Sequence, residues 1–396
     1  MVILFVTRWY VEKRRNKLIN LSGMPTYIYR ITKALKERGH EPIVVAASTK
    51  TRKEILEGIE VHYVKYKEIQ TGSEVLNLGL NDILRDLKLH CEVKKVAKKK
   101  KIDLIQYAGC TGTGLFHSNQ TPGILRLSTY SKVYNIFENK NQSLGVRFES
   151  FLERMASRKM DGIIAPSYAM GVPFGKDTHR NVQIIETPFF NEVKENDLSV
   201  YKKRLEDKKY FLYFGNITPN KGVFTIAGTF SELFGKYPDY YFVFIGTDYF
   251  YKNKRCSVLM REAAGRYANQ ILYLSPLEHK QLYPIIEKAE LVVLPSLMEN
   301  FSNACMEAMY FNGLVAATAG TSFEQLIKEE ETGFLSIPGN SESLYKAIEK
   351  AMNLQEEKKE QIRLAAKKRV EQLRPEIAVA RLENYYNYIL KKRSTK

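Results

Sequence analysis

Short apolar runs alternate with longer amphipathic stretches through the first half of the chain. Each run has the length of one buried strand rather than of a helix. The runs lie at residues 2–6, 43–47, 104–107, 124–127 and 162–165. The stretches at 24–38 and 144–158 carry apolar residues at helical spacing, and the first of them stops at Gly39. This alternation of strand and helix predicts parallel βαβ units.

The same alternation begins again after a polar, charged stretch at residues 191–209. Its strand candidates lie at residues 210–214, 242–245, 271–274, 291–294 and 314–317. We therefore predict an α/β protein with two Rossmann-like, doubly wound domains, 1–190 and 200–372, and a Tyr-rich helix at 375–396 that packs back on the first. Two such domains in tandem are expected to face each other across a cleft, with ligands at the carboxyl ends of the strands.

Two glutamates follow the strand at 291–294 and are separated by seven residues. Glu299 is expected in the loop after the strand. Glu307 is expected inside the next helix, which should begin near Ser302 or Asn303, since both are good N-caps. The free N–H groups at that helix start suit a diphosphate, and the carboxylates suit sugar hydroxyls. The alternative is that Glu299 is an ordinary charged loop residue and that Glu307 is a surface residue of the helix.

The turn after the strand at 210–214 carries a lysine and two glycines. Gly215 permits close approach of a ligand to the backbone, and Lys221 can neutralise a phosphate as a point charge. Taken alone, the Lys221-Gly222 pair carries little information, because such pairs are common in turns.

Together these residues resemble the retaining GT-B glycosyltransferases of family 4, often called group 1. That family carries a Gly-Arg-x-x-x-x-Lys-Gly turn, then Pro-Ser before a Glu, seven residues, a second Glu, Ala-Met and a glycine. The chain keeps this order and spacing from about residue 210 to 340, and ends it with Thr332-Gly333-Phe334-Leu335. The first half matches more loosely.

The resemblance implies a nucleotide-sugar donor held by the second domain and an acceptor held by the first. By position, Lys221 would steady the leaving diphosphate, Glu299 would contact the donor sugar, and Glu307 would contact the ribose. These positions make Glu299 and Lys221 the catalytic candidates. The remaining donor-binding candidates are Gly215, Asn216, Leu277, Phe301, Ser302 and Asn303. No obligatory metal or other cofactor is implied.

The chain departs from the family pattern at three places. Asn216 stands where the family has an arginine for the diphosphate, and the N-terminal loop keeps one glycine, Gly23. A histidine often found after the fifth strand is absent from the stretch 125–130, which contains Arg126 and Ser128. Gly23, Arg126 and Ser128 are therefore the acceptor-side candidates. Arg126 could supply the missing charge or form a structural ion pair.

The charge of the chain is uneven. Lys+Arg number 61 against 44 Asp+Glu, a net charge of +17, and residues 1–150 alone hold 26 basic against 14 acidic residues. The basic segments at 8–17 and 94–101 could face anionic lipid, the second as an amphipathic helix with Val93 and Val96, or could form a solvated surface. Stacking motifs for nucleic acid are absent, so we expect no nucleic-acid partner.

Cysteine and histidine spacing gives no metal or disulfide pattern. Cys91, Cys110, Cys256 and Cys305 are scattered, and no apolar run approaches the ~20 residues that span a bilayer. The histidines, His279 among them, are interpreted as structural or surface residues. We expect a cytoplasmic protein, with peripheral contact at the inner face of the cell membrane.

The function indicated is transfer of a hexosyl or N-acetylhexosaminyl group from a nucleotide sugar to a lipid-linked or polysaccharide acceptor. The alternative is a catalytically weakened accessory protein of the same fold that stabilises a partner transferase, because Asn216 and the missing histidine remove two family groups. A nucleic-acid binder, favoured by charge alone, is the third class.

Overall fold

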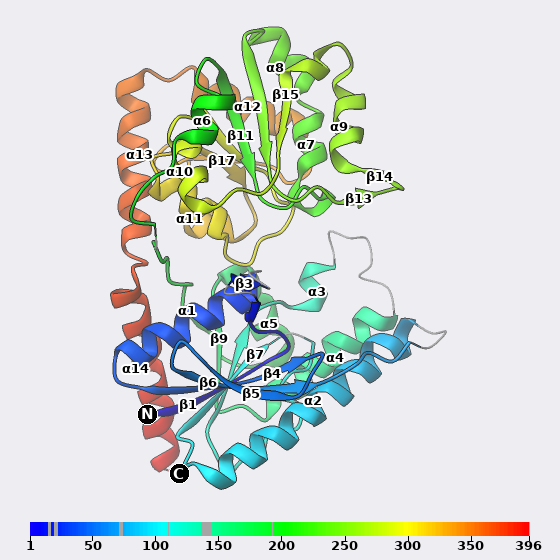
Figure 1. Cartoon of the computed structure of the whole chain (residues 1–396), viewed down its shortest axis with the longest axis vertical. Coiled ribbons are helices and arrows are strands. Elements are labelled where there is room, and N and C mark those ends of the chain that lie inside the picture. Colours follow the sequence, from blue (N-terminus) through cyan, green and yellow to red (C-terminus); the bar gives the residue numbers. More distant parts are fainter. Residues whose placement is uncertain are drawn as a thin grey trace. The chain divides into compact units, whose positions relative to one another are not determined.

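The computed structural model describes residues 1–14, 17–19, 23–70, 74–109, 111–135, 144–191 and 193–395. The chain divides into two compact units (Figure 1). Unit 1 comprises residues 1–190 and 375–396, and unit 2 comprises residues 191–374. Each unit is built on its own β-sheet.

Among its described residues, unit 1 has an eight-stranded sheet of order β10-β9-β8-β7-β1-β4-β6-β5. Neighbouring strands are parallel except at the edge, where β5 runs antiparallel to β6. The strands are β1 (Val2–Thr7), β4 (Glu41–Ser48), β5 (Arg52–Leu56), β6 (Ile59–Lys65), β7 (Leu104–Gly109), β8 (Gly123–Leu127), β9 (Gly162–Ala165) and β10 (Gln183–Ile184). The helices are α1 (Gly23–Glu37), α2 (Glu74–Lys99), α3 (Ser131–Tyr134), α4 (Leu144–Arg158), α5 (Tyr168–Thr178) and α14 (Pro375–Ser394). The hairpin of β2 (Glu12–Arg14) and β3 (Lys17–Ile19) forms a separate ribbon.

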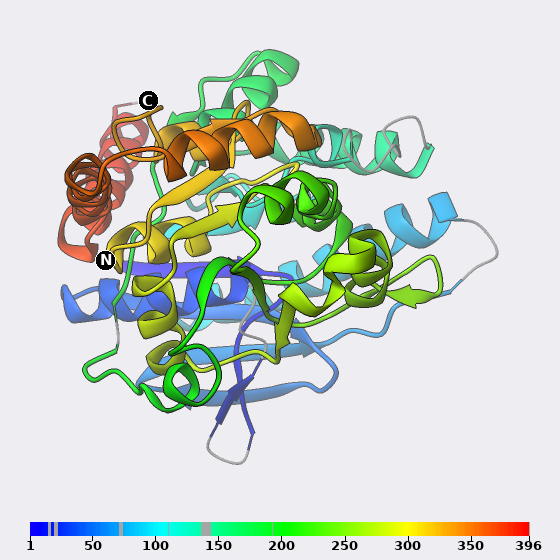
Figure 2. The same cartoon turned by 90° about the horizontal axis from the view of Figure 1, so that it is seen from above.

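Helix α14 belongs to unit 1 although it follows unit 2 in the sequence. It packs beside α1, as Figure 2 shows from above, and its Leu382 and Tyr386 join the same buried cluster as Phe5 of β1. The Tyr386 hydroxyl donates a hydrogen bond of 2.5 Å to Gln106 of β7. Gly162 allows this approach, since a Cβ there would lie 2.6 Å from the Tyr385 hydroxyl oxygen.

Among its described residues, unit 2 has a six-stranded, wholly parallel sheet of order β15-β12-β11-β16-β17-β18. The strands are β11 (Lys209–Phe214), β12 (Tyr240–Ile245), β15 (Ile271–Leu274), β16 (Leu291–Leu294), β17 (Val315–Thr318) and β18 (Phe334–Ser336), with a ribbon of β13 (Phe250–Tyr251) and β14 (Lys254–Arg255). The helices are α6 (Ser199–Arg204), α7 (Val223–Ala227), α8 (Phe230–Lys236), α9 (Cys256–Ala264), α10 (His279–Glu287), α11 (Asn303–Tyr310), α12 (Ser341–Met352) and α13 (Glu356–Glu371). Three 3₁₀ turns complete it: η1 (Pro219–Lys221), η2 (Gly265–Gln270) and η3 (Ser322–Gln325).

The prediction of two parallel, doubly wound sheets is confirmed, and the structure adds elements that the pattern did not predict. The expected loop after β1 contains the β2–β3 hairpin, and the polar stretch at 191–209 contains α6. Strand β6 alternates buried and half-buried residues because only one of its faces lies in the core, so it lacks a continuous apolar run.

Candidate functional site

The predicted donor residues of unit 2 follow strands whose carboxyl ends lie at one edge of its sheet. Gly215 follows β11, Leu277 follows β15, and the segment 295–302 follows β16. Because the strands are parallel, these segments share that edge. A hydrogen bond of 2.9 Å from the Leu297 N–H to the Asn220 carbonyl joins two of them directly.

Gly222 allows the turn after β11 to lie against the segment after β16. Its φ of 73° is left-handed, and a Cβ there would lie 1.8 Å from the Pro295 carbonyl oxygen. Only glycine meets both conditions without displacing backbone. The residue next to it, Lys221, is thereby held close to the start of the segment 295–302.

Lys221 and Glu299 form an ion pair between these two segments. The Ser296 hydroxyl donates a second hydrogen bond, of 3.0 Å, to the same carboxylate oxygen of Glu299. The two charged side chains are 28 % and 14 % exposed, so both retain access to solvent. The structure thus brings together a cation and a carboxylate that lie 78 residues apart in the sequence.

Helix α11 begins where the sequence predicts it. Ser302 is its N-cap, and the Ser302 hydroxyl oxygen accepts a hydrogen bond of 3.3 Å from the Cys305 N–H. The preceding residue Phe301 is half-buried, and Asn303 is the first helical residue. The first N–H groups of a helix have no acceptor within it and carry partial positive charge. This end of α11 can therefore accept an anion beside Lys221.

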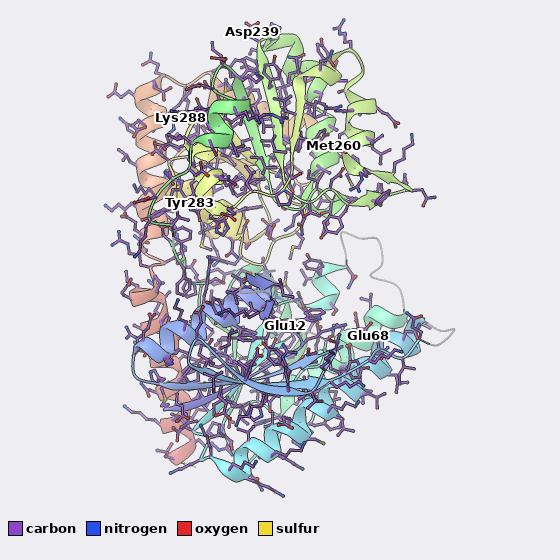
Figure 3. All side chains as sticks on the ribbon, in the orientation of Figure 1. Glu12, Glu68, Asp239, Met260, Tyr283 and Lys288 are labelled. Carbon is purple, nitrogen blue, oxygen red and sulfur yellow. The ribbon has the colours of Figure 1, made fainter. Side chains whose placement is uncertain are left out.

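Glu307 lies on α11 with 9 % of its surface exposed. Nε2 of His279 lies 3.6 Å from its Oε1 atom. The His279 ring stacks on Tyr283 of α10, which is labelled in Figure 3, and Tyr283 stacks on Phe311 at a centroid distance of 3.5 Å. The interpretation of His279 as a structural or surface residue thus missed a contact with a candidate site residue. The available signal was its place two residues after Leu277, at the same strand end.

Asn216, which replaces the family's arginine, is exposed. Its carbonyl accepts a hydrogen bond of 2.6 Å from the hydroxyl of Tyr213, and burial raises the pKa of that hydroxyl well above its usual value. The Asn216 side chain makes no hydrogen bond with another described residue. The turn is therefore held through its backbone, and the Asn216 side chain supplies no positive charge.

Arg126, at the end of β8 in unit 1, is buried among uncharged groups. Its guanidinium carbon lies 3.5 Å from the ring centroid of Tyr27, and its Nη atoms donate to the hydroxyls of Ser128 and Thr187 at 3.3 Å and 3.1 Å. Burial lowers its pKa. It forms no ion pair with any described residue, so the structural ion pair that the sequence left open is not formed in the part of the chain described.

Gly23 is the first residue of α1. A Cβ built there would meet no atom within 4 Å, so the surrounding structure does not itself require a glycine. Of the predicted acceptor-side residues, Arg126 and Ser128 are therefore held in place by hydrogen bonds. Gly23, at the start of α1, stands at a position where the surrounding structure leaves room for a larger residue.

A polar cluster at the ends of β1 and β7 was not predicted. Arg8 donates a hydrogen bond of 3.0 Å to Glu68, and the buried Asp82 pairs with Arg85. The Thr111 hydroxyl accepts a hydrogen bond of 3.2 Å from Arg85. Arg8, Glu68 and Asp82 help to line a cavity of about 310 Å³. The sequence signal was a single arginine directly after the first strand, and arginines are too common for that to stand out.

Glu153 of α4 is a buried carboxyl group close to this cluster. Burial raises its pKa to about 8, although it accepts hydrogen bonds from the hydroxyl and N–H of Ser131 at 2.9 Å and 3.1 Å. The Thr111 N–H lies 3.4 Å from the same carboxyl. Glu153 thus fixes the loop after β7, where Thr111 has a φ of +47°.

The predicted membrane-facing helix at 94–101 is corrected in one respect. Its apolar residues Val93 and Val96 are 4 % and 3 % exposed, because they pack into the core of unit 1. They cannot also insert into lipid. Lys94, Lys95 and Lys98 on the same turns are exposed, so the basic face of the segment remains accessible.

The described part of the chain has neither a membrane-spanning helix nor a cluster of metal-ligating side chains. No helix there is long and apolar enough to cross a membrane. No group of three or more His, Cys, Asp or Glu side chains there has an arrangement that could hold a metal ion. Cys91, Cys256 and Cys305 are free thiols, and Cys110 lies outside the described residues.

Two family models match the chain. Residues 196–369 match the model described as glycosyl transferases group 1, and residues 21–172 match glycosyltransferase family 4. Together they cover most of both units.

Individual proteins are similar to the chain at low identity. A human protein, one of the subunits of phosphatidylinositol N-acetylglucosaminyltransferase, is 23 % identical over 348 residues, which cover 84 % of this chain and 66 % of the human protein. The chain thus spans slightly less than two thirds of that relative. Sucrose-phosphate synthase from Thermosynechococcus elongatus superimposes with a TM-score of 0.76 and 16 % identity over 99 % of this chain and 100 % of that one. HepE of Anabaena, in complex with UDP and glucose, superimposes with a TM-score of 0.73 and 19 % identity. The match covers 98 % of this chain and 99 % of that one.

Proposed function

The chain belongs to the group 1 glycosyltransferases of family 4 and has their GT-B fold, and from this premise we propose that it transfers a sugar from a nucleoside-diphosphate sugar to a lipid-linked or polysaccharide acceptor. We propose further that the transfer retains the anomeric configuration and serves cell-surface glycan synthesis. The observation that carries this proposal is the Lys221–Glu299 ion pair beside the N-terminus of α11.

The donor diphosphate would bind against Lys221 and the first N–H groups of α11. Both carry positive charge, fixed by the turn at Gly222 and the cap at Ser302, and such preorganised charge stabilises the negative charge that develops on a leaving diphosphate. An anion at this position competes with Glu299 for Lys221. Binding of the donor would therefore release the Glu299 carboxylate to accept hydrogen bonds from hydroxyls of the transferred sugar.

Glu307 would accept hydrogen bonds from the ribose hydroxyls, with His279 holding its carboxylate from the other side. The backbone near Leu277 would contact the base, since it follows the neighbouring strand end. The diphosphate itself would accept the proton of the acceptor hydroxyl during attack on the same face of the sugar. No metal ion is needed for these steps, because Lys221 and the helix supply the positive charge.

The sugar and the place of action are also proposals. We propose a hexosyl or N-acetylhexosaminyl group, in line with the N-acetylglucosaminyltransferase name of the human relative. We propose action at the cytoplasmic face of the membrane, with contact to anionic lipid through exposed lysines such as Lys94 and Lys98. With Val93 and Val96 in the core, this contact would be electrostatic and would weaken as salt is added.

The donor site is tested by calorimetric titration of the full chain with UDP, GDP and the corresponding nucleotide sugars. Lys221→Ala should weaken binding of the preferred diphosphate about 10- to 100-fold, because a hydrogen bond to a charged group contributes about 1.5–3 kcal/mol. Glu299→Gln should leave diphosphate binding within a few-fold of the wild type and abolish most sugar transfer.

Lys236→Ala is the matched control. Lys236 pairs with Glu349 on the surface of the same unit, and it ends α8 just before β12, at the amino edge of the sheet and therefore opposite the site. It should bind diphosphates as the wild type does. An equal loss of diphosphate binding in both lysine variants would overturn the proposed roles. Sugar transfer by Glu299→Gln at the wild-type rate would also overturn them.

The second candidate function is that of an accessory protein that stabilises a partner transferase. Asn216 in place of an arginine, and the absence of the family's histidine from the stretch 125–130, favour it. The name of the human relative, which describes one subunit of a transferase, is in line with it. Absence of binding to every nucleoside diphosphate, with stable association to another transferase, would establish this function in place of catalysis.

A further inference from the structure

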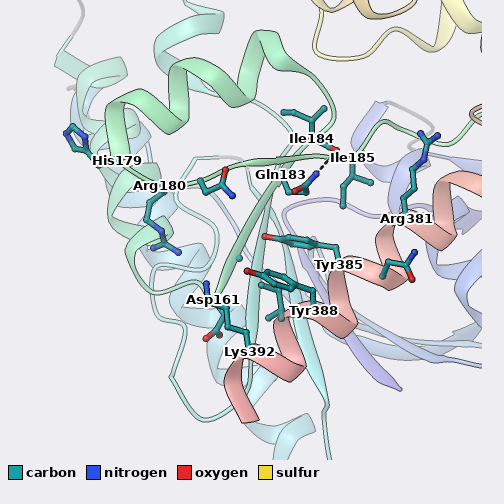
Figure 4. Close-up of a pocket in the computed structure, with 14 residues that line it drawn as sticks. Asp161, His179, Arg180, Gln183, Ile184, Ile185, Arg381, Tyr385, Tyr388 and Lys392 are labelled. Carbon is teal, nitrogen blue, oxygen red and sulfur yellow. Dashed lines mark hydrogen bonds between the residues drawn. The ribbon is translucent and has the colours of Figure 1, made fainter. Parts of the chain in front are cut away.

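A cavity of about 640 Å³ lies within unit 1, between α14 and the segment that leads into β10 (Figure 4). It is bordered by Asp161 and Gly162 at the start of β9, by residues 179–185, and by the outer face of α14 from Arg381 to Lys392. We refer to it as the α14 pocket. Its volume matches that of pockets that hold small molecules.

The α14 pocket runs along the outer edge of the sheet, beside β9 and β10. It begins at Asp161, which precedes β9, and extends to Ile185, which follows β10. Arg126 and Ser128 lie at the carboxyl end of β8, which is parallel to β9. Neither residue lines the pocket, so a ligand at its Asp161 end, which is the amino end of β9, would occupy a site separate from the one proposed for transfer.

Positive charge converges on the pocket. Arg180 donates to the carbonyls of Ser157 and Met160 at 2.9 Å and 2.6 Å, so its guanidinium is held in place without being neutralised. Lys392 of α14 lies at the same end of the pocket, whereas Arg381, eleven residues earlier and about 16 Å away along the helix axis, borders the other end. Guanidinium groups bind phosphoryl oxygens well, because their donors match that geometry.

Among the described residues, the one carboxylate that lines the pocket is already occupied. Asp161 accepts hydrogen bonds of 3.0 Å from Arg393 and 2.8 Å from the Gly123 N–H. Glu186, close by, lies 3.8 Å from Arg381, and that pair leaves Arg180 and Lys392 without a carboxylate partner in the described part of the chain. The pocket therefore favours an anion.

Two tyrosines form one wall. Tyr385 and Tyr388 stack with their centroids 6.1 Å apart, and in Figure 4 both rings point from α14 toward the cavity. The amides of Gln183 and Asn384 border the same space. Aromatic rings offer an apolar face with a polar edge, which suits the C–H face of a sugar ring, and amides can both donate to and accept from hydroxyls.

We propose that the α14 pocket binds a sugar or polyol that carries a phosphoryl group. The phosphoryl group contacts Arg180 and Lys392, and the ring lies against Tyr385 and Tyr388. The same chemistry occurs in a free sugar phosphate and in the headgroup of an inositol lipid, so the experiment includes both.

The test is calorimetric titration of the full chain with glucose 1-phosphate, glucose and inorganic phosphate. We expect saturable binding of glucose 1-phosphate at least tenfold tighter than binding of either other compound. Lys392→Gln should weaken it at least tenfold, and the exposed position tolerates the change. Tyr388→Ser should weaken the binding of glucose 1-phosphate but not the binding of inorganic phosphate.

Lys391→Gln is the matched control, because Lys391 is an exposed neighbour on α14 that does not line the pocket. Equal weakening by this variant would assign the effect to the overall positive field and overturn the proposal. Absence of binding, or equal binding of inorganic phosphate, would also overturn it. A competition experiment then separates the two sources of the ligand. If phosphatidylcholine vesicles that contain phosphatidylinositol displace glucose 1-phosphate, and vesicles that contain phosphatidylglycerol do not, the pocket binds the lipid headgroup. If neither kind of vesicle displaces bound glucose 1-phosphate, the pocket binds a free sugar phosphate. Lys221→Ala should leave this binding intact, which separates it from the donor site.

Discussion

Replacement of Glu153 by glutamine should change the pH dependence of the stability of unit 1. Burial raises the pKa of the Glu153 carboxyl from its usual 4.5 to about 8. Between these two values the folded state binds more protons than the unfolded state. The free energy of unfolding therefore falls as pH rises through this window, and the contribution of Glu153 is fully present only below pH 4.5.

The size of the effect follows from the two pKa values. The difference between the two pKa values corresponds to a change of about 5 kcal/mol in the free energy of unfolding over the whole window. About 3–4 kcal/mol of this change lies between pH 5 and pH 8. Glu153→Gln keeps an oxygen that can accept from the Ser131 hydroxyl, and it does not titrate. The variant should therefore gain about 3–4 kcal/mol relative to the wild type when the pH is raised from 5 to 8.

Urea unfolding at a series of pH values measures this difference. Trp9, the single tryptophan, lies in unit 1, so its fluorescence reports on that unit. Comparing the two proteins cancels other titrating groups, such as Asp86, whose pKa burial raises to about 6, and His117, whose pKa burial lowers to about 4. Glu357→Gln, at an exposed position on α13, controls for the loss of one negative charge. A stability difference between Glu153→Gln and the wild type that stays constant with pH would refute the reasoning.

Three further substitutions test how the sites are held. Gly222→Ala should destabilise unit 2 by about 3 kcal/mol, because the left-handed φ and the clash with the Pro295 carbonyl add, and urea unfolding followed by circular dichroism measures this. Ser302→Ala should weaken the first turn of α11 by about 1 kcal/mol in amide exchange, and Ser302→Asp should restore it. Glu383→Gln should lower the free energy of opening of α14, measured by amide exchange, by about 0.5–1 kcal/mol, since Glu383 lies 2.7 Å from Arg38, which directly follows α1; unchanged exchange would show that the pair does not hold the helix.

Strands buried on both faces could be predicted from the sequence. The runs at 162–165 and 291–294 match β9 and β16 at both ends, because helices cover both sides of a parallel sheet and leave no polar alternation. Strand β6 and the antiparallel β5 were missed for the opposite reason. β5 is the edge strand and β6 is its neighbour; one face of each is only partly covered, and β5 exposes Ile55.

The candidate site was predictable in its local chemistry and not in its long-range contacts. A serine before an amphipathic stretch is enough to predict the N-cap of α11, because capping depends on neighbouring residues. The contact of His279 with Glu307 depends on where α10 begins relative to α11, which no local pattern encodes. In the same way, the packing of Arg126 on Tyr27 joins the end of β8 to α1 across the interior of unit 1.

The return of α14 to unit 1 has a consequence for synthesis of the protein on the ribosome. Residues 1–190 emerge first, but the residues of α14 that complete their core emerge only after residues 191–374 have been made. At typical elongation rates that interval lasts roughly 10–40 s. Throughout it, the surface of β1, β7 and α1 that later receives Leu382 and Tyr386 stays uncovered, and exposed apolar surface of this kind makes a nascent domain prone to aggregation. The second unit, being continuous in sequence, can finish folding before the first.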